Sequence, residues 1–418
     1  MNTNENKTSR VIIVGIAERG SEVDECNISL DELSRLVDTA GGEVVGRVLQ
    51  IKESFDPRTC IGSGKVMEIA ELCKADEVDT VVFDFELTPA QIRNLENDIN
   101  LDVRVIDRSM LILDIFALHA VSGEGKLQVE LAQLKYSAPR LMGHGTEMSR
   151  LGGGIGTRGP GETKLETDRR HMKERVVTLE KRLAEMEHTR QIMRSQRDKS
   201  GLTKVAIVGY TNAGKSTLLN RLTDAGVLSE DKLFATLDAT TRKYTLPSGE
   251  SILLTDTVGF VRKLPHHLVK AFKSTLDEVT YADVLLIVTD VNDTEAARHI
   301  AVTEEVIAEL SASDKPIVYV FNKCDKYEGA LPADERTDTV YVSAKSGDGI
   351  PTLIEKIEEI IKQNKKECNL LLPYSAQSML SSLYDEYTVK SVEYTDEGIL
   401  VTTVLDEKGR GIYSKFIK

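Results

Sequence analysis

The sequence predicts an α/β protein of four parts: a small α/β domain, an antiparallel coiled-coil helical hairpin, a phosphate-loop domain and a small α+β domain. Three observations support this prediction. A Gly-x-x-x-x-Gly-Lys-Ser loop at residues 209–216 lies between a short β-type run and a helical one. Strand-like and helix-like segments alternate from residue 10 to about residue 120. Apolar residues recur at heptad spacing between residues 165 and 193, which indicates a long paired helix.

The first part, residues 1–122, is expected to form the small α/β domain with a mostly parallel sheet. Strands are expected at residues 11–16, 43–51, 80–83 and 103–107. Helices are expected at residues 29–41, 65–74 and 88–97. The first helix should open with the capping box Ser29 to Glu32 and stop at Gly41 and Gly42. The segment Gly62 to Lys65 lacks a full phosphate loop, so we interpret it as a turn and helix start.

The second part, residues 123–200, is expected to form the hairpin of two antiparallel helices. The first helix presents one apolar face, made by Leu127, Leu131, Leu134 and Ala138. The second helix should open at the capping box Thr163 to Glu166. Its heptad seam consists of Leu165, Met172, Val176, Leu179, Leu183, Met186 and Met193.

The loop between these helices is dense in glycine and is flanked by basic residues. Gly154, Gly156 and Gly159 form a G-x-G-x-x-G pattern, but no strand precedes it, so a dinucleotide site is not expected. Arg150 and Arg158 can instead present guanidinium groups to a polyanion, with a flexible hinge as the alternative. Residues 140–199 hold 14 Lys or Arg against 9 Asp or Glu, within a chain whose net charge is −14. This basic region fits one polyanionic surface, and a solvated charged helix is the alternative.

The third part, residues 201–366, carries the phosphate loop. Gly209 and Gly214 let the backbone wrap closely around a phosphate chain. Lys215 brings a cation to the β and γ phosphates, and the Ser216 hydroxyl can bind Mg²⁺. The predicted phosphate contacts are Gly209, Tyr210, Thr211, Asn212, Ala213, Gly214, Lys215, Ser216 and Thr217.

Three further motifs follow at strand ends and identify the base. In the first, Asp256, Thr257, Val258 and Gly259, the carboxylate can hold Mg²⁺ through water and the glycine N–H can meet the γ-phosphate. In the second, Asn322, Lys323, Cys324 and Asp325, the last carboxylate can accept from guanine N1–H and the 2-amino group, which rejects adenine by about 10⁴-fold. The third, Ser343, Ala344 and Lys345, can contact guanine O6 through its backbone amides. Together the four motifs predict a P-loop GTPase domain.

Two features of the switch regions bear on hydrolysis. A threonine must complete the Mg²⁺ shell when the γ-phosphate is present, and spacing alone leaves Thr236, Thr240 and Thr241 open. Phe260 follows Gly259, where many small GTPases carry a glutamine that orients the attacking water. Phenylalanine cannot do this, so we expect slow intrinsic hydrolysis that depends on a partner, another residue or a changed water geometry. Simple packing of Phe260 is a compatible alternative.

The fourth part, residues 367–418, is expected to form the small α+β domain after a charged linker at residues 362–367. It should hold a helix near residues 375–384, strands at 389–394 and 398–405, and a turn at 406–409 that leads to a last short strand.

Composition bounds the setting of the chain. Its 418 residues are 41% hydrophobic and 29% charged, as in globular proteins. The longest apolar runs, such as residues 284–288, are too short to span a bilayer, and residues 1–10 lack the apolar stretch of a signal peptide. Five cysteines are scattered without C-x-x-C pairs. We therefore expect a cytoplasmic protein with reduced thiols, no zinc site and no membrane span.

Several segments resemble the HflX family, translational GTPases of the Obg–HflX superfamily. They are residues 107–108, 112–116, 126–134, 152–162, 165–170 and 234–238, and the resemblance covers essentially the whole chain. It implies GTP-dependent binding to the ribosome, chiefly the large subunit and its RNA, and ribosome splitting under stress. The implied ligands are GTP, GDP and Mg²⁺. A GTP-dependent scaffold whose hairpin binds a protein partner is the competing hypothesis.

The resemblance also assigns roles in the first switch. It implies Thr236 as the switch threonine, so that Ser216 and Thr236 bind the metal and Lys215, Thr236 and Gly259 act in hydrolysis. The implied nucleotide contacts there are Phe234, Ala235, Thr236, Leu237 and Asp238. Some family members bind or hydrolyse ATP, but nothing in this sequence places a second site. The segment Gly143 to Glu147 departs from the family pattern. We expect a monomer, with pairing of the seam between chains and peripheral membrane association as alternatives.

Overall fold

The computed structural model describes residues 8–99, 101–141, 160–198, 202–223, 233–234, 239–263, 273–332, 334, 336–364, 366–405 and 407–418. The chain divides into two compact units. The first unit comprises Met1–Glu185, Glu230–Asp238 and Arg262–Lys273, and the second unit comprises the remainder. Two short segments that flank the nucleotide motifs in sequence therefore belong to the first unit.

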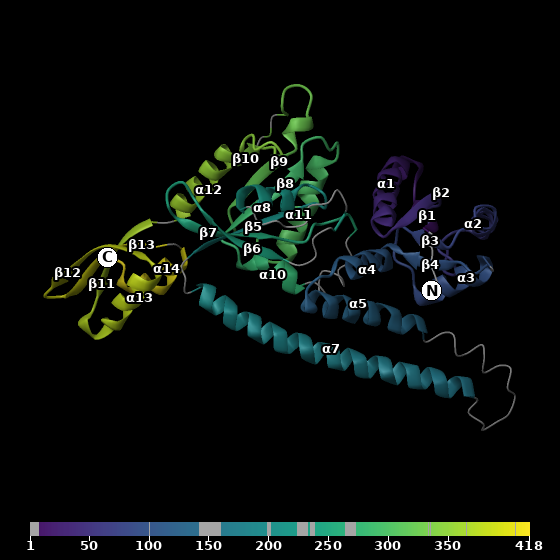
Figure 1. Cartoon of the computed structure of the whole chain (residues 1–418), viewed down its shortest axis with the longest axis horizontal. Helices are drawn as coiled ribbons and strands as arrows, with labels where there is room; N and C mark the ends of the chain where they lie inside the picture. The colour runs from purple at the N-terminus through teal and green to yellow at the C-terminus, as the bar shows by residue number, and fades with distance from the viewer. Residues whose placement is uncertain are drawn as a thin grey trace, which may run out of the picture. The chain divides into compact units, whose positions relative to one another are not determined.

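A four-stranded parallel sheet forms the centre of the first unit (Figure 1). Its strands lie in the order β2-β1-β3-β4. They are β1 (Ser9–Ala17), β2 (Gly42–Ile51), β3 (Thr80–Phe83) and β4 (Arg104–Asp107). The four strands expected from the sequence are confirmed, because β-branched runs bounded by helices leave few alternatives.

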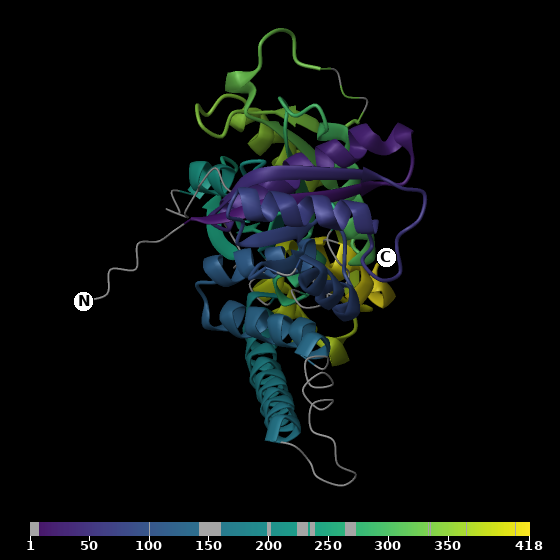
Figure 2. The ribbon, with the colours of Figure 1, turned by 90° about the vertical axis from the view of Figure 1, so that its right-hand side faces the viewer.

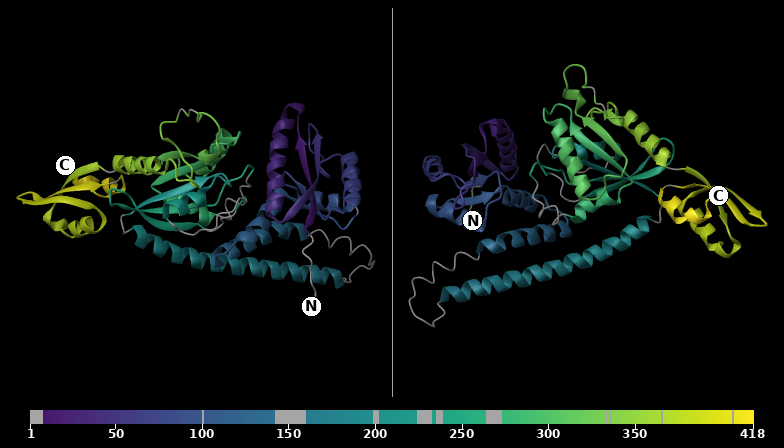
Figure 3. Two further views of the ribbon diagram at one scale, coloured as in Figure 1. Left: turned by 45° about the horizontal axis from the view of Figure 1, so that its top comes forward. Right: turned by 180° about the vertical axis from the view of Figure 1, so that it is seen from behind.

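Helices cover both faces of this sheet, as Figure 3 shows. α2 (Ser63–Ala75) and α3 (Pro89–Ile99) pack on the face that carries Ile12, Val81 and Phe83. α1 (Val23–Thr39) begins six residues before the expected capping box, and Ser29 is buried within it, donating a hydrogen bond to Asp84. α4 (Arg108–His119) was not expected, and the Asp107 carboxylate caps its first turn at the Met110 N–H.

The next two helices are α5 (Gly123–Leu141) and α7 (Pro160–Asp198), and the glycine loop between them lies outside the described residues. α5 packs beside α4 (Figure 2). Ion pairs join α5 to α7, between Glu130 and Arg175 at 2.6 Å and between Lys135 and Glu180 at 2.8 Å. On α7 the heptad position Leu179 is fully buried, while Thr178 and Glu180 beside it are exposed. α7 begins at Pro160, ahead of the expected capping box at Thr163.

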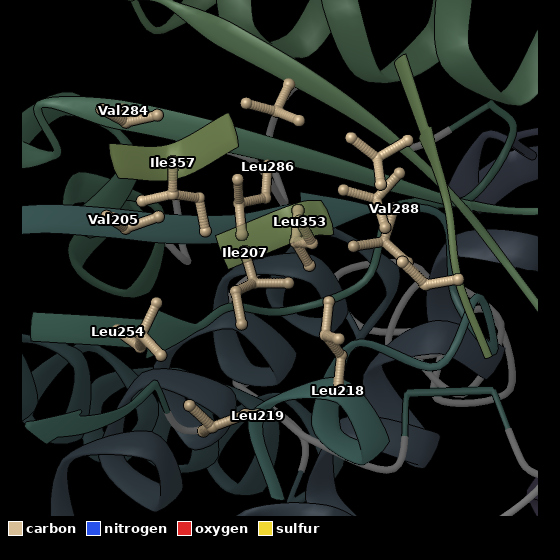
Figure 4. Close-up of a cluster of buried hydrophobic side chains, with 14 of the residues drawn as sticks. Val205, Ile207, Leu218, Leu219, Leu254, Val284, Leu286, Val288, Leu353 and Ile357 are labelled. Atoms are coloured by element: carbon tan, nitrogen blue, oxygen red, sulfur yellow. The ribbon is translucent and has the colours of Figure 1, made fainter. Parts of the chain in front are cut away.

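A six-stranded sheet in the order β10-β9-β8-β5-β7-β6 forms the centre of the second unit. Its strands are β5 (Thr203–Gly209), β6 (Thr240–Thr245), β7 (Ser251–Asp256), β8 (Val284–Asp290), β9 (Ile317–Asn322) and β10 (Thr339–Tyr341). Only β6 runs antiparallel to its neighbour. Figure 4 shows the core in which Leu218 of α8 (Lys215–Thr223) and Leu353 of α12 (Ile350–Asn364) pack on one face of this sheet. α10 (Lys273–Tyr281) precedes β8, and α11 (Ala296–Glu309) contacts β5 and β8.

The C-terminal residues form an antiparallel sheet in the order β11-β13-β12 (Figure 3). Its elements are β11 (Lys366–Leu372), α13 (Ser378–Glu386), β12 (Thr388–Thr395), β13 (Gly398–Leu405) and α14 (Glu407–Ile412). The expected linker at residues 362–367 is wrong: α12 ends at Asn364, and β11 alternates so that Leu370 and Leu372 are buried. The expected last strand is also wrong. α14 takes its place and brings Tyr413 into the core of this sheet. No helix in the described parts of the chain is long and apolar enough to cross a membrane.

Candidate nucleotide site

Three of the predicted motifs begin where parallel strands of the second unit end. β5 ends at Gly209, β7 at Asp256 and β9 at Asn322. Since parallel strands present their carboxyl ends at one edge, these motifs meet there. Ligands of open α/β sheets bind at this edge.

The two loop glycines occupy backbone positions that admit no side chain. Gly209 has φ +141°, and a Cβ there would lie 2.2 Å from the Val288 carbonyl oxygen. Gly214 has φ +92°, and its Cβ would lie 2.3 Å from Asn322 Nδ2. The loop therefore lies close against β8 and the end of β9, as a phosphate cradle requires.

Lys215 is buried at the start of α8, behind this loop. Its Nζ donates a hydrogen bond to the Tyr210 carbonyl oxygen at 2.8 Å. Burial lowers the pKa of this lysine to about 8, although the charge of Asp256 opposes the shift. A fixed cation at a helix N-terminus suits an anionic phosphate chain.

Ser216 and Asp256 bring two kinds of oxygen together beside the loop. The Ser216 hydroxyl donates to Asp256 Oδ2 at 2.6 Å. Asp256 is fully buried, and its Oδ1 has no hydrogen-bond partner among the described residues. Burial raises the pKa of this carboxyl, and Lys215 opposes the rise. Such a pair of oxygens can serve a hard divalent cation that completes its shell with phosphate or water. Within the described ranges, no cluster of three or more His, Cys, Asp or Glu forms a self-sufficient metal site.

The motif after β7 folds onto the phosphate loop. A Cβ on Gly259 would lie 2.8 Å from Lys215 Nζ, so this glycine faces the lysine directly. Phe260 donates its N–H to the Gly209 carbonyl oxygen, and its own carbonyl accepts from Thr211 N–H at 2.8 Å. The Phe260 side chain is 1% exposed. Phe260 thus packs in the core, and its backbone joins this motif to the phosphate loop. Thr257 and Val258 are also buried.

One buried asparagine connects the motif at residues 322–325 with the phosphate loop and with the motif at residues 343–345. Asn322 Nδ2 donates to the Ala213 carbonyl oxygen at 2.9 Å, and its Oδ1 accepts from Ala344 N–H at 2.9 Å. Asp325 Oδ1 accepts from the Ser343 hydroxyl at 2.7 Å, which lowers the pKa of this exposed carboxyl. The arrangement holds an ionised carboxylate open to solvent beside the strand ends, ready to accept from a base.

Two residues that support these motifs, Asp290 and Arg221, were missed by sequence reasoning. Lys323 has φ +65°, and its Nζ lies 2.9 Å from Asp290 Oδ2 at the end of β8. Arg221 on α8 donates to the Ser346 carbonyl oxygen at 2.7 Å, beside Lys345. Burial raises the pKa of the Cys324 thiol, which favours its neutral form. A polar residue at the end of a buried strand was the available signal for Asp290.

The first switch is divided between the two units. Leu233 and Phe234 belong to the first unit, where the Phe234 ring packs edge-on against Phe116 with centroids 4.6 Å apart. Thr240 and Thr241 lie in β6, and the Thr241 hydroxyl bonds that of Thr255 at 2.9 Å. The expected nucleotide contact of Phe234 stays a prediction. Ala235, Thr236, Leu237 and Asp238 lie outside the described residues.

The segment after Phe260 also enters the first unit, through an ionic cluster that no motif predicted. The cluster comprises Glu25, Glu32, Asp84, Arg108, Arg262 and Lys263. Lys263 Nζ lies 2.6 Å from Asp84 Oδ2, and Arg262 Nη2 lies 3.1 Å from Glu25 Oε1. Arg108, whose side chain is 2% exposed, donates a hydrogen bond to Asp84 at 2.7 Å and lies within ion-pair distance of Glu32 at 3.2 Å. We call this set the switch cluster.

Three family models match the chain in sequence order. One described as GTP-binding GTPase N-terminal matches residues 27–117. One described as GTP-binding GTPase Middle Region matches residues 119–197, and one described as 50S ribosome-binding GTPase matches residues 204–323. Together these models account for most of the chain.

Relatives with the name GTPase HflX match over nearly their whole length. That of Lacrimispora saccharolytica is 49% identical over 394 residues, covering 94% of this chain and 92% of its own. That of Escherichia coli K12 is 42% identical over 374 residues, covering 88% and 87%. A solved GTP-binding protein of Sulfolobus solfataricus in complex with GDP is 26% identical, with a TM-score of 0.43, and covers 85% of this chain and 99% of its own. The three family models and the two HflX relatives show that the chain belongs to the HflX family and is an enzyme that hydrolyses GTP.

Proposed function

We propose that this GTPase binds the ribosome, chiefly the large subunit and its RNA, in its GTP state, and splits ribosomes under stress. The family description of a 50S ribosome-binding GTPase supports the partner. The switch cluster is the observation that carries the dependence on nucleotide. Arg262 and Lys263 lie three and four residues after Gly259 in sequence, and they bind carboxylates of the first unit. A change in this segment on GTP binding would therefore alter the first unit.

In this proposal Mg²⁺ is held by Ser216 and Thr236, with Asp256 acting through water. The buried Asp256 Oδ1, which has no hydrogen-bond partner in the described structure, supports this assignment because an oxygen so placed needs a donor or a cation. The metal would neutralise charge on the β and γ phosphates. Lys215 would bind the same phosphates, and the Gly259 N–H would meet the γ-phosphate.

Hydrolysis would be slow without the partner. Phe260 is buried and carries no group that could orient the attacking water. The groups of this chain that would act on the phosphate are those of Lys215, Thr236 and Gly259. The ribosome, or a residue placed by it, would complete the site. ATP as a second nucleotide has no support among the residues of this site.

The four-part organisation forms part of the same proposal: residues 1–122, 123–200, 201–366 and 367–418. α5 and α7, joined by the ion pairs at Glu130 and Lys135, would make the antiparallel hairpin. Arg150 and Arg158 in its loop would contact ribosomal RNA. The protein would act as a cytoplasmic monomer.

Co-sedimentation with purified ribosomes tests the proposal. We expect the protein to migrate with the large subunit in a sucrose gradient with a non-hydrolysable GTP analogue, and to stay at the top with GDP. Equal migration in both states would remove the nucleotide dependence, and no association in either state would remove the ribosome as partner.

Charge reversal separates RNA contact from the protein-scaffold alternative. Arg150→Glu with Arg158→Glu should weaken ribosome binding and reduce its salt dependence, because phosphate contacts release counterions. Lys181→Glu, at an exposed position of α7, is the matched control. If the double variant binds as the unchanged protein does, the glycine loop is not the RNA contact.

A further inference from the structure

A histidine outside all four nucleotide motifs stacks on the phosphate loop. The imidazole of His299, on α11, lies parallel to the Tyr210 ring, with centroids 3.6 Å apart and planes 10° apart. Tyr210 is the first variable residue of the loop and is 6% exposed. Both rings therefore have their positions fixed by the stack and by the surrounding core.

The backbone of Tyr210 holds the parts of the site that act on phosphate. Its carbonyl oxygen accepts from Lys215 Nζ at 2.8 Å. The same residue forms a β-bridge with Phe260, through the hydrogen bonds of Gly209 and Thr211. A shift of the Tyr210 peptide would therefore move the lysine and loosen the loop from the Gly259 motif at once.

The other side of His299 leads to the base-reading motif. His299 Nδ1 lies 3.2 Å from Asp293 Oδ2, in the loop after β8. The Asp293 N–H donates to the Asp290 carbonyl oxygen at 3.2 Å, and the Asp290 carboxylate pairs with Lys323 at 2.9 Å. Contacts thus run without a gap from Lys323 through His299 to Lys215.

We propose that His299 is a positioning residue for GTP binding and hydrolysis. Its ring fixes the Tyr210 peptide, whose carbonyl aims the Lys215 ammonium at the β and γ phosphates. The Asp293 carboxylate, 3.2 Å from Nδ1, sets the orientation of the ring. The stack is the essential part, and the Asp293 contact refines it.

This role predicts that nucleotides with a β-phosphate and nucleotides without one respond differently to the loss of the stack. Lys215 acts on the β and γ phosphates, whereas Asp325 reads the base from a separate loop. Loss of the stack should therefore weaken GTP and GDP but leave GMP, which has neither phosphate. An aromatic stack contributes about 0.5–1.5 kcal/mol, which corresponds to about two- to tenfold in affinity.

Three substitutions separate the ring from its polar edge. His299→Phe keeps the stack and loses the Asp293 contact, so GDP and GTP affinity should stay within about twofold of the unchanged protein. His299→Asn keeps a polar edge and loses the stack, and His299→Ala loses both. These two should weaken GDP and GTP by about two- to tenfold while the affinity for GMP is unchanged.

The measurement is displacement of a fluorescent GDP by GTP, GDP and GMP, with circular dichroism melting of each variant. Glu305→Ala, an exposed position of the same helix, is the matched control and should change nothing. Equal loss for GMP and GDP, or equal loss in the Phe and Ala variants, would overturn the positioning role. Unchanged affinities in the Ala variant would overturn it as well.

A double-variant cycle tests the partner of the ring. If His299 acts through Tyr210, His299→Ala should add little to the loss already caused by Tyr210→Ala. Additive losses would show that His299 acts by another route and would contradict the proposal.

Discussion

Lys263 and Asp84 form an ion pair, with Nζ 2.6 Å from Oδ2, although 179 residues separate them in sequence. Asp84 is buried and also binds Arg108 and Ser29, whereas half of the Lys263 side chain is exposed. Lys263 lies four residues after Gly259, which faces Lys215. The pair therefore lies within the first unit, in a segment that follows the Asp256 to Gly259 motif closely in sequence.

The two cations of Asp84 should differ sharply in their effect on stability. Arg108→Met leaves Asp84 and Glu32 without their buried cation, which should destabilise the first unit by about 3–5 kcal/mol. Lys263→Met removes a half-exposed partner and should cost at most about 1 kcal/mol. Hydrogen exchange of α1 and α4 amides under native conditions measures both. Equal protection in the two variants would contradict the assignment of Arg108 as the central cation.

Two glycine-to-alanine substitutions should distinguish the effect of backbone strain at positive φ from the effect of a steric clash of the new Cβ. Gly214→Ala places a Cβ 2.3 Å from Asn322 Nδ2 at φ +92°, so it should abolish tight nucleotide binding. Gly249→Ala has a similar φ of +86° with no atom within 4 Å, so it should cost only about 1 kcal/mol of strain and leave binding unchanged. Isothermal titration with GDP distinguishes them. Tight binding by the Gly214 variant would show that the loop does not close as described.

Nucleotide binding should weaken as the pH rises above about 8. Burial lowers the pKa of Lys215 to about 8 in the empty protein, from an ordinary value of 10.5, and bound phosphates restore its charge. Above that pH the empty protein has lost the proton and must take it up on binding, so GDP affinity should fall by up to about tenfold per pH unit. Below about pH 7 it should be level.

The lowered pKa of Lys215 has the opposite effect on the stability of the empty protein: stability should rise with pH where nucleotide affinity falls. The unfolded chain keeps its lysine proton up to pH 10.5, so the empty folded protein should gain stability from this group as the pH rises above about 8. The control for binding is Lys215→Arg, whose guanidinium keeps its charge. Should that variant bind GDP, its affinity must be level between about pH 7 and pH 9; the same fall there would exclude Lys215 as the titrating group.

The base reader makes a prediction about specificity. Asp325→Asn should exchange the preference for guanine with one for xanthine, because the amide can donate to the carbonyl that xanthine has at the 2-position. Ser343→Ala is the matched control: it removes the hydrogen bond that lowers the pKa of Asp325 but leaves the carboxylate in place. It should keep the guanine preference. Competition between GDP and xanthosine diphosphate measures both, and an unchanged preference in the Asn variant would remove Asp325 as the reader.

What the sequence predicts well is the chemistry that needs particular residues at fixed spacing. Gly209, Gly214, Asp256 and Asn322 meet at one sheet edge because each closes or follows a parallel strand. Burial of Phe260 likewise follows from its place beside the phosphate loop.

The remainder depends on tertiary contacts that leave no local pattern. Asp84 and His299 are single polar residues whose partners lie far away in sequence, so neither pairing can be inferred from spacing. At the C-terminus the turn predicted at residues 406–409 was expected to lead into a strand. A helix forms there instead, and Tyr413 after it is buried in the core of the C-terminal sheet. The start of α1 was placed too late because Ser29 bonds a distant carboxylate rather than its own helix terminus.

The central claim is that the GTP state of this protein separates ribosomal subunits. Light scattering of purified intact ribosomes, mixed rapidly with the protein and a non-hydrolysable GTP analogue, measures this directly. We expect a fall in scattering with the analogue, no fall with GDP, and none with Lys215→Ala in either nucleotide. A fall of equal size with GDP, or unchanged scattering with the analogue while the protein binds the ribosome, would contradict it.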